Sequence, residues 1–301
     1  MRVFIAGATG YIGGTVAARL VAYGHRVRGL VRNPDSAAHL ERCGIEPAIG
    51  DLEDVRLPAA EAALADAVIH AANADHRSSV EAMLAAIEGT AKVFIHTSGA
   101  GIVADKAGGE ERPAVHDEAT VIHPIPARAP RMTLIDDIRA FSSRGVRTVV
   151  IAPPMVYGAG TGLHLDSIQI PRMIAAAREH RVGLYVGPGT NRWSNVHIED
   201  LADLYLRALE QAPAGAFYFA ENGEESMGDI ASAISRMLGF AGETRSLSVA
   251  DAYGVYGEPM VDLSFGSNCR VRAKRARQEL GWLPHRTALL DDIERGSYTL
   301  R

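Results

Sequence analysis

The feature that most constrains the fold is a glycine-rich segment directly after a short apolar strand. The strand is expected over Arg2–Ala6, and Gly7-Ala8-Thr9-Gly10-Tyr11-Ile12-Gly13 follows it and opens a helix expected over Tyr11–Tyr23. Glycines at these positions allow a tight turn, a close backbone approach to a phosphate, and close packing of the helix on the strand. Because the segment lies at a strand-to-helix junction, it predicts a dinucleotide-binding α/β domain.

Strands and helices alternate through the first half of the chain. Further strands are expected at Arg26–Val31, Glu46–Ile49, Ala67–His70, Lys92–Thr97 and Thr148–Ala152. They are short, apolar on both faces and bounded by Gly, Asp or Pro, as buried parallel strands are. We therefore predict an α/β fold: a Rossmann-like, doubly wound parallel sheet with a smaller, mostly helical C-terminal substrate lobe.

Two regions depart from this alternation. Residues 99–130 contain several Pro and Gly with weak periodicity, and we expect a lid there because the segment leaves the carboxyl end of the fifth strand. Beyond Pro153 the pattern loosens again. We predict a dinucleotide-binding domain over residues 1–155, with returning segments around 184–220, and a substrate-binding lobe mainly over 156–301.

Net charge and cysteine content limit which classes of partner and which compartment we expect for this chain. A formal charge of −5 gives no general attraction for a polyanion, so no nucleic-acid partner is expected. The two cysteines, Cys43 and Cys269, show no metal-ligand spacing, which predicts no metal and a reducing compartment. With no signal-peptide pattern and no apolar run of about 18 residues, we expect no membrane association and a cytoplasmic protein, either monomer or homodimer.

The end of the second strand bears on the choice of cofactor. An NAD site places an acidic residue there to bind the ribose 2′-hydroxyl, whereas a 2′-phosphate is bound by Arg. Val31 occupies the acidic position and Arg32 follows it. This favours NADP(H), with Arg32 and Thr9 at the 2′-phosphate, and NAD(H) stays open because Asp35 lies nearby.

Several motifs recur in a fixed order along the chain. They are Gly7–Gly13, Gly50-Asp51-Leu52, His70-Ala71-Ala72, Thr97-Ser98, Pro154-Met155-Val156-Tyr157-Gly158, the segment Trp193–Asp200, and Leu280-Gly281-Trp282-Leu283-Pro284. Together they make the chain resemble, over nearly its whole length, an extended short-chain dehydrogenase/reductase of the NAD-dependent epimerase/dehydratase type. The resemblance implies a cofactor site formed by Gly7, Thr9, Gly10, Tyr11, Ile12, Gly13, Arg32, Asp51, Leu52, Ala71, Ala72, Thr97, Pro153 and Val156.

Within that site the resemblance assigns separate roles. Asp51 would accept from the adenine amino group, and Leu52 would pack against the ring. Ala71 and Ala72 would line the ribose and nicotinamide side, while Pro153 and Val156 would flank the nicotinamide. Candidates for substrate contact in the second lobe are Trp193, Asn195 and His197.

The acid–base pair of the family, Tyr-x-x-x-Lys, is missing. No Tyr lies between Tyr23 and Tyr157, and no Lys between Lys106 and Lys274. Alignment places Arg128 and Met132 at the two positions. Gly99 falls where the family has a hydroxyl, with Ser98 one residue away. The chain thus resembles atypical members that lack this pair, some of which are ketoreductases of aromatic polyketides.

The missing pair favours reduction over oxidation. Removing a proton from an unactivated alcohol needs a base, whose help is worth about 10² to 10⁴ in rate. A ketone needs only a donor or a positive field at the developing oxyanion. We therefore predict an NADPH-dependent ketoreductase acting on a small, aromatic or polyketide-type ketone. The catalytic candidates are Ser98, His123 and Arg128, with Tyr157 a weaker one.

Two other functions stay open. A non-catalytic regulator that senses NADP(H) would explain the missing pair without any turnover. A nucleotide-sugar epimerase or dehydratase would need a cationic second lobe for the diphosphate. The arginines that would form it are Arg172, Arg178, Arg181 and Arg192, although the first three also fit the polar face and end of one helix.

Overall fold

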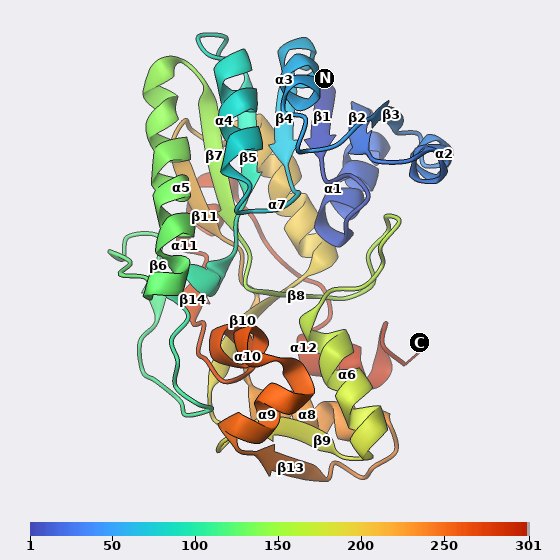
Figure 1. Cartoon of the computed structure of the whole chain (residues 1–301), viewed down its shortest axis with the longest axis vertical. Coiled ribbons are helices and arrows are strands. Elements are labelled where there is room, and N and C mark those ends of the chain that lie inside the picture. Colours follow the sequence, from blue (N-terminus) through green and yellow to red (C-terminus); the bar gives the residue numbers. More distant parts are fainter. Residues whose placement is uncertain (300–301) are drawn as a thin grey trace.

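The computed structural model describes residues 1–299, whose main layer is a seven-stranded parallel sheet (Figure 1). Its strand order is β11-β7-β5-β4-β1-β2-β3, and all pairs are parallel. The strands are β1 (Arg2–Ala6), β2 (Arg26–Val31), β3 (Glu46–Ile49), β4 (Ala67–His70), β5 (Val93–Thr97), β7 (Arg147–Ala152) and β11 (Ala216–Phe219). The predicted fold class is confirmed, and the six predicted strands agree to within one residue.

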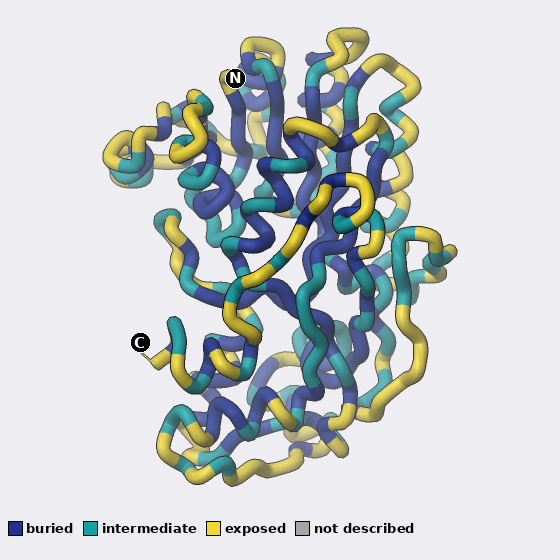
Figure 2. Tube along the Cα trace, turned by 180° about the vertical axis from the view of Figure 1, so that it is seen from behind, coloured by how far each residue is buried: buried dark blue, intermediate teal, exposed yellow. Residues whose placement is uncertain are grey.

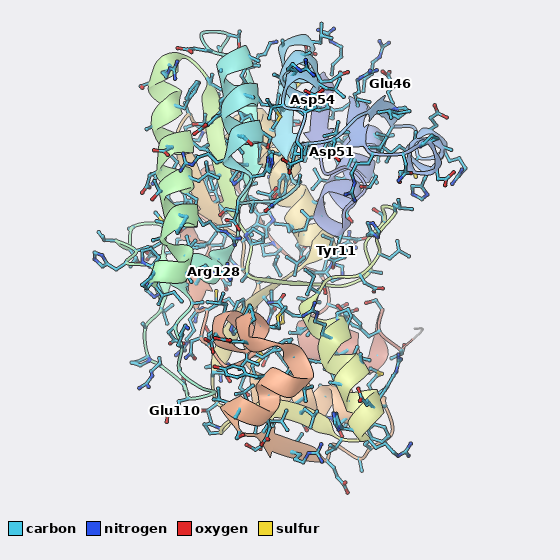
Figure 3. The ribbon with its side chains drawn as sticks, in the orientation of Figure 1. Tyr11, Glu46, Asp51, Asp54, Glu110 and Arg128 are labelled. Carbon is cyan, nitrogen blue, oxygen red and sulfur yellow. The ribbon has the colours of Figure 1, made fainter. Side chains whose placement is uncertain are left out.

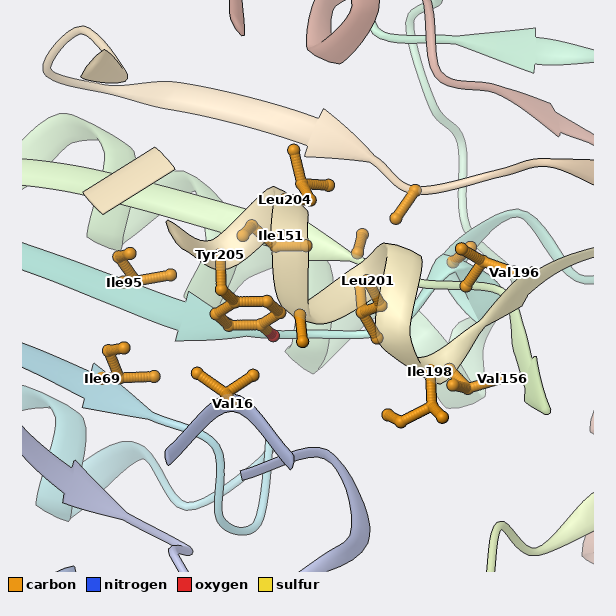
Figure 4. Packing of buried hydrophobic residues seen from close by; sticks show 14 of the residues in the cluster. Val16, Ile69, Ile95, Ile151, Val156, Val196, Ile198, Leu201, Leu204 and Tyr205 are labelled. Carbon is orange, nitrogen blue, oxygen red and sulfur yellow. The ribbon is translucent and has the colours of Figure 1, made fainter. Parts of the chain in front are cut away.

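Helices cover both faces of this sheet. They are α1 (Tyr11–Ala22), α2 (Pro34–Arg42), α3 (Arg56–Leu64), α4 (Arg77–Ala86), α5 (Ala129–Ala140) and α7 (Ile198–Gln211). Helix α1 packs against α7, and α3 packs against α4. Tyr205 of α7 is fully buried on the sheet near Val16, Ile69 and Ile95 (Figure 4). The returning helix α7 therefore holds the carboxyl ends of the central strands against α1.

The second lobe is smaller and mostly helical, and it lies beyond the carboxyl ends of the main strands (Figure 1). Its helices are α6 (Gln169–His180), α8 (Met227–Met237), α9 (Val249–Tyr256), α10 (Glu258–Met260) and α12 (Leu289–Arg295). A π-helical turn, Val261–Phe265, directly follows α10. Its strands form a three-stranded sheet of β8 (Met155–Tyr157), β10 (Arg192–His197) and β12 (Gly223–Ser226), and a pair of β9 (Gly183–Val186) and β13 (Thr244–Leu247). Buried residues run through both lobes (Figure 2).

Chain segments cross between the lobes more than once. After β10 the chain returns to the main layer as α7 and β11, and helix α11 (Lys274–Leu280) packs against both. These crossings bring segments that are distant in sequence to the carboxyl edge of the sheet.

The segment after β5, where we expect a lid, contacts the second lobe. It contains short helical turns at Ala100–Val103 and Pro126–Arg128, and β6 (His116–Asp117) pairs with β14 (Val271–Arg272). The carboxylate of Asp105 accepts from the backbone of Asn268 at 2.8 Å. Lys106 forms an ion pair with Asp262 at 2.7 Å. Composition alone could not show that residues far along the chain supply partners for this segment.

Candidate active site

The glycine-rich loop has the geometry of a phosphate cradle. Gly7 has a φ of 97°, and a side chain there would meet the carbonyl oxygen of Ala71 at 2.4 Å. A side chain on Gly13 would lie 2.2 Å from the carbonyl oxygen of Gly7. Gly10 caps α1 without any side-chain hydrogen bond, so the amides of the first turn stay open to an anion. These residues therefore fit the pyrophosphate of a dinucleotide.

Residues 158–168, which we call the strap, cross from the second lobe onto the start of α1. The Tyr11 hydroxyl donates to the carbonyl of Gly158 at 2.9 Å, and the His164 amide donates to the carbonyl of Thr9 at 3.3 Å. A side chain on Gly162 would lie 2.7 Å from the Cα of Gly14. The strap therefore packs backbone to backbone on α1, beside the phosphate cradle.

The other residues assigned to the nucleotide lie in different environments. Arg32 and Asp51 are exposed at the ends of β2 and β3, and Leu52 is half-buried against the core (Figure 3 labels Asp51). Ala71 and Ala72 are half-buried after β4. All of them lie at the carboxyl edge of the sheet, where ligands of such folds bind.

Thr97 does not offer its side chain to a cofactor. Its hydroxyl lies 2.7 Å from the hydroxyl of Tyr205 on α7, in the core between the sheet and that helix. Strand alternation points this side chain at α7, so a cofactor contact of Thr97 would have to involve its backbone. The buried hydroxyl pair instead ties β5 to the returning helix.

A cavity of about 610 Å³ lies between the lobes. On the nucleotide side it is lined by predicted site residues, namely Tyr11, Ile12, Ala71, Pro153 and Val156. The second lobe contributes an apolar wall that includes Trp193, Pro259, Met260 and Leu263. Ser98, Arg128 and Arg131 form its polar end, and Figure 3 shows Arg128 at the foot of α5 and Tyr11 at the start of α1.

Two polar groups at that end have no protein partner. The Ser98 side chain is only 8% exposed, and its hydroxyl makes no hydrogen bond. The Nε of Arg128 is likewise buried and unpartnered, and no ion pair forms between Arg128 and a carboxylate within residues 1–299. Burial, and then the like charge of Arg131, lower the pKa of Arg128. Buried polar groups rarely lack a hydrogen-bond partner, so the Ser98 hydroxyl and the Arg128 Nε indicate a place for a ligand.

Arg131 differs from its neighbour because its charge is already balanced. Its Nε donates to Oδ1 of Asp75 at 2.7 Å, and its Nη2 donates to the other carboxylate oxygen. Asp75 lies in the loop after β4. Sequence reasoning missed Arg131 and Asp75. Arg131 had a usable signal, because it lies three residues after Arg128 at the start of a helix.

The remaining catalytic candidates lie elsewhere. His123 is exposed in the segment before α5 and does not line the cavity. Tyr157 is fully buried, its hydroxyl donates to the carbonyl of Thr287 at 2.7 Å, and burial raises its pKa. The structure therefore does not bring these two to the polar end. His197 accepts from the amide of Glu199 at 3.2 Å and so caps α7.

The arginines considered for a diphosphate do not line the cavity either. Arg192 is held by Glu224 at 2.9 Å, and the same carboxylate binds Arg270 and Arg272. Arg172, Arg178 and Arg181 lie on α6 and at its end, outside the cavity. Within the described residues the cavity thus has two arginines, of which one is paired.

Residues 1–299 hold no cluster of three or more His, Cys, Asp or Glu side chains that could bind a metal ion. No helix in the same range is long and apolar enough to cross a membrane.

A dinucleotide cradle at the carboxyl edge of a Rossmann-like sheet, facing a second lobe across a cavity, defines an oxidoreductase of the short-chain dehydrogenase/reductase type. Residues 3–218 match the NAD dependent epimerase/dehydratase family, and the chain belongs to that family.

Relatives of the chain are similar over most of its length. An uncharacterised protein of Schizosaccharomyces pombe is 32% identical over 99% of this chain and 100% of its own. The 4-hydroxy-2-methyl-3-oxo-4-farnesyl-3,4-dihydroquinoline-1-oxide ketoreductase of Stigmatella aurantiaca is 29% identical over 74% of this chain and 69% of its own. Among solved structures, a dTDP-glucose 4,6-dehydratase of Bacillus anthracis in complex with NAD superposes with a TM-score of 0.78, at 14% identity, over 100% of this chain and 96% of that one.

Proposed function

We propose that the protein is an NADPH-dependent ketoreductase that reduces a small, aromatic or polyketide-type ketone. One observation carries this proposal. The Ser98 hydroxyl and the Nε of Arg128 have no protein partner, and both residues line the same cavity as Pro153 and Val156. The similarity to a ketoreductase of Stigmatella aurantiaca supports the same reaction class.

The cradle fits a nicotinamide dinucleotide, which supplies a hydride when it is bound in reduced form. The loop Gly7–Gly13 would hold its pyrophosphate, and Ala71 and Val156 would lie on its nicotinamide side. Arg32 is exposed at the end of β2 and supports a choice of NADP(H), because a guanidinium binds a 2′-phosphate through charged hydrogen bonds. NAD in the related dehydratase supports the broader class of cofactor.

Ser98 and Arg128 have complementary parts in this reaction. The Ser98 hydroxyl donates to the carbonyl oxygen and fixes its position. The Arg128 guanidinium, which stays charged, stabilises the negative charge that develops on the same oxygen. Because the loss of one such donor typically costs about 10²–10³ in rate, the two can replace much of what a phenol acid provides. The proton that completes the alcohol then comes from water.

The direction of the reaction follows from the same groups. Neither a hydroxyl nor a guanidinium is a base that could take a proton from an unactivated alcohol near neutral pH. Both can donate to an oxyanion. The site therefore supports ketone reduction better than the alcohol oxidation with which an epimerase or dehydratase begins.

The experiment that tests this is an absorbance assay of NADPH oxidation with a panel of aromatic ketones, with Ser98→Ala as the matched control. We expect turnover that requires a ketone and falls in the variant. If NADPH binds tightly while no ketone is reduced, the reductase assignment fails and an NADP(H)-sensing role gains support. Isothermal titration with NADP⁺ and NADPH supplies the binding measurement.

A further inference from the structure

We propose that the substrate carries a carboxylate and that Arg128 binds it. This inference rests on the proposed function, since it takes the ligand of the cavity to be the ketone. The reason is a half-buried cation without a counter-ion: Arg128 lines the cavity, its Nε is buried and unpartnered, and it makes no ion pair within the described chain.

The surroundings of Arg128 favour the binding of an anion. The charged groups that act on Arg128 from neighbouring elements are Arg131 and Asp75, and those two already bind each other. Among the described residues, the acidic residue that lines the cavity is Asp166, which is solvent-exposed near the end of the strap. Burying a charge without a partner is costly, and a ligand carboxylate at this point would remove that cost.

The number of charges limits which anion fits. Two guanidinium groups and one bound carboxylate leave one net positive charge at the polar end. One charge matches a monoanion, whereas a phosphate ester or a diphosphate would bring at least one negative charge too many. The planar fork of a guanidinium also matches the two oxygens of a carboxylate.

The backbone keeps this guanidinium accessible. A side chain on Gly101 would lie 3.6 Å from Nη2 of Arg128, and one on Gly99 would lie 3.5 Å from Nη1 of Arg131. Both glycines follow Ser98 in the turn after β5. Because Gly99 and Gly101 carry no side chains, a ligand can contact the Ser98 hydroxyl and the Arg128 guanidinium together. We therefore expect the ketone and the carboxylate to lie near each other in the substrate.

The opposite wall of the cavity indicates what the rest of the substrate is like. Trp193, Met260 and Leu263 face the cavity from the second lobe and offer only apolar surface apart from the Trp193 indole N–H, which donates to the carbonyl of Ser267 at 2.8 Å. The substrate class that these features define is an oxo acid with an aromatic or aliphatic body.

The first test measures binding without turnover. The full-length protein loaded with NADP⁺ is titrated calorimetrically with hydrocinnamate and with its neutral amide, hydrocinnamamide. We expect the carboxylate to bind at least about tenfold more tightly than the amide, as a charge-assisted pair provides. Arg128→Gln should abolish this preference, and Arg128→Lys should keep part of it. Arg172→Gln, on α6 and outside the cavity, should leave it unchanged. Thermal unfolding of each variant confirms that it folds.

The second test uses turnover to separate this inference from the proposed function. The enzyme is assayed with benzoylacetate and with its ethyl ester, which presents the same ketone without the charge. We expect Arg128→Gln to lower kcat for both substrates, because an oxyanion donor is lost, and to raise the KM by about tenfold or more for the acid but little for the ester. Equal binding of hydrocinnamate and its amide by the wild type would overturn the carboxylate site, even if neutral ketones are reduced. No reduction of any ketone, with a hydrocinnamate preference intact, would overturn the reductase and leave the site standing.

Discussion

The guanidinium of Arg131 and the carboxylate of Asp75 form a two-point pair, with Nε and Oδ1 2.7 Å apart. Arg131 comes from α5 and Asp75 from the loop after β4, so the pair joins two segments at the carboxyl edge of the sheet. It also divides two neighbouring arginines into one that is neutralised and one, Arg128, that is not.

The charge of Asp75 should set which anions the cavity accepts. In Asp75→Asn the guanidinium of Arg131 loses its counter-charge, so two unbalanced positive charges face the cavity and a dianion should gain affinity. We expect phenyl phosphate to bind at least about tenfold more tightly than to the wild type, and hydrocinnamate to change by less than about threefold. Calorimetric titration measures both. Unchanged phosphate binding would show that Arg131 does not face the ligand.

Removal of the Ser98 hydroxyl should slow the reaction and spare the cofactor. In Ser98→Ala we expect kcat for ketone reduction to fall by about 10²-fold, because one preorganised donor to the developing oxyanion is lost. Ser98→Thr, which keeps a hydroxyl, should recover most of the rate. Steady-state kinetics and NADPH titration check this together. A drop in NADPH affinity as large as the drop in kcat would place Ser98 in the cofactor site instead.

The close packing at Gly13 should tolerate no side chain. In Gly13→Ala the new methyl would lie 2.2 Å from the Gly7 carbonyl oxygen, so α1 must move away from the cradle. We expect a loss of about 1–3 kcal/mol in the free energy of unfolding and a large loss of NADPH affinity. The matched control is Gly254→Ala in α9, where nothing lies within 4 Å and stability should rise slightly. Urea unfolding with and without NADPH gives both quantities.

The exposed side chain of Arg32 should decide the preference between cofactors. In Arg32→Ala we expect the KM for NADPH to rise by about 10- to 100-fold while the KM for NADH changes little, since only NADPH carries the 2′-phosphate. Initial rates with both cofactors and one ketone test this. Equal losses with the two cofactors would mean that Arg32 supports the loop and does not read the phosphate.

A buried histidine pair should make the fold sensitive to acid. His70 and His96 stack with ring centroids 5.2 Å apart beneath the loop that carries Asp75, and burial lowers their pKa values to about 4 and about 3. Below about pH 6.5 the unfolded chain binds protons that the folded chain does not, so stability falls as pH falls.

For one such histidine the loss between pH 7 and pH 5 is about 2 kcal/mol. We therefore expect His96→Leu to unfold with a flatter dependence on pH than the wild type over this range. Urea midpoints at the two pH values measure the difference. The same slope in both proteins would show that His96 is not the group that titrates.

Much of the fold could be predicted because its signals are local. The strand over Arg2–Ala6 and the glycines after it need only near neighbours in the chain, and the structure has them where expected. The seventh strand, β11, was missed because Ala216–Phe219 is short and far from the other strands in sequence. Its place beside β7 is fixed by tertiary packing.

The site was predictable only in part, for a related reason. Arg128 was found by counting along a known motif, and the structure places it in the cavity. The surroundings of the Thr97 hydroxyl could not be predicted, because its partner, Tyr205, lies 108 residues away in sequence. Asp75 carried no signal of its own, since an acidic residue in a loop is ordinary until the base that binds it is known.

The strap links the position of the second lobe to the start of α1. Gly162 touches the first turns of α1 at Gly14, and the same segment runs on directly into α6 of the second lobe. Any rotation of that lobe must therefore either carry the start of α1 with it or pull two glycine backbones apart. If the cofactor and the ketone both favour the lobe position seen here, thermodynamic reciprocity requires that each raise the affinity of the other by the same factor.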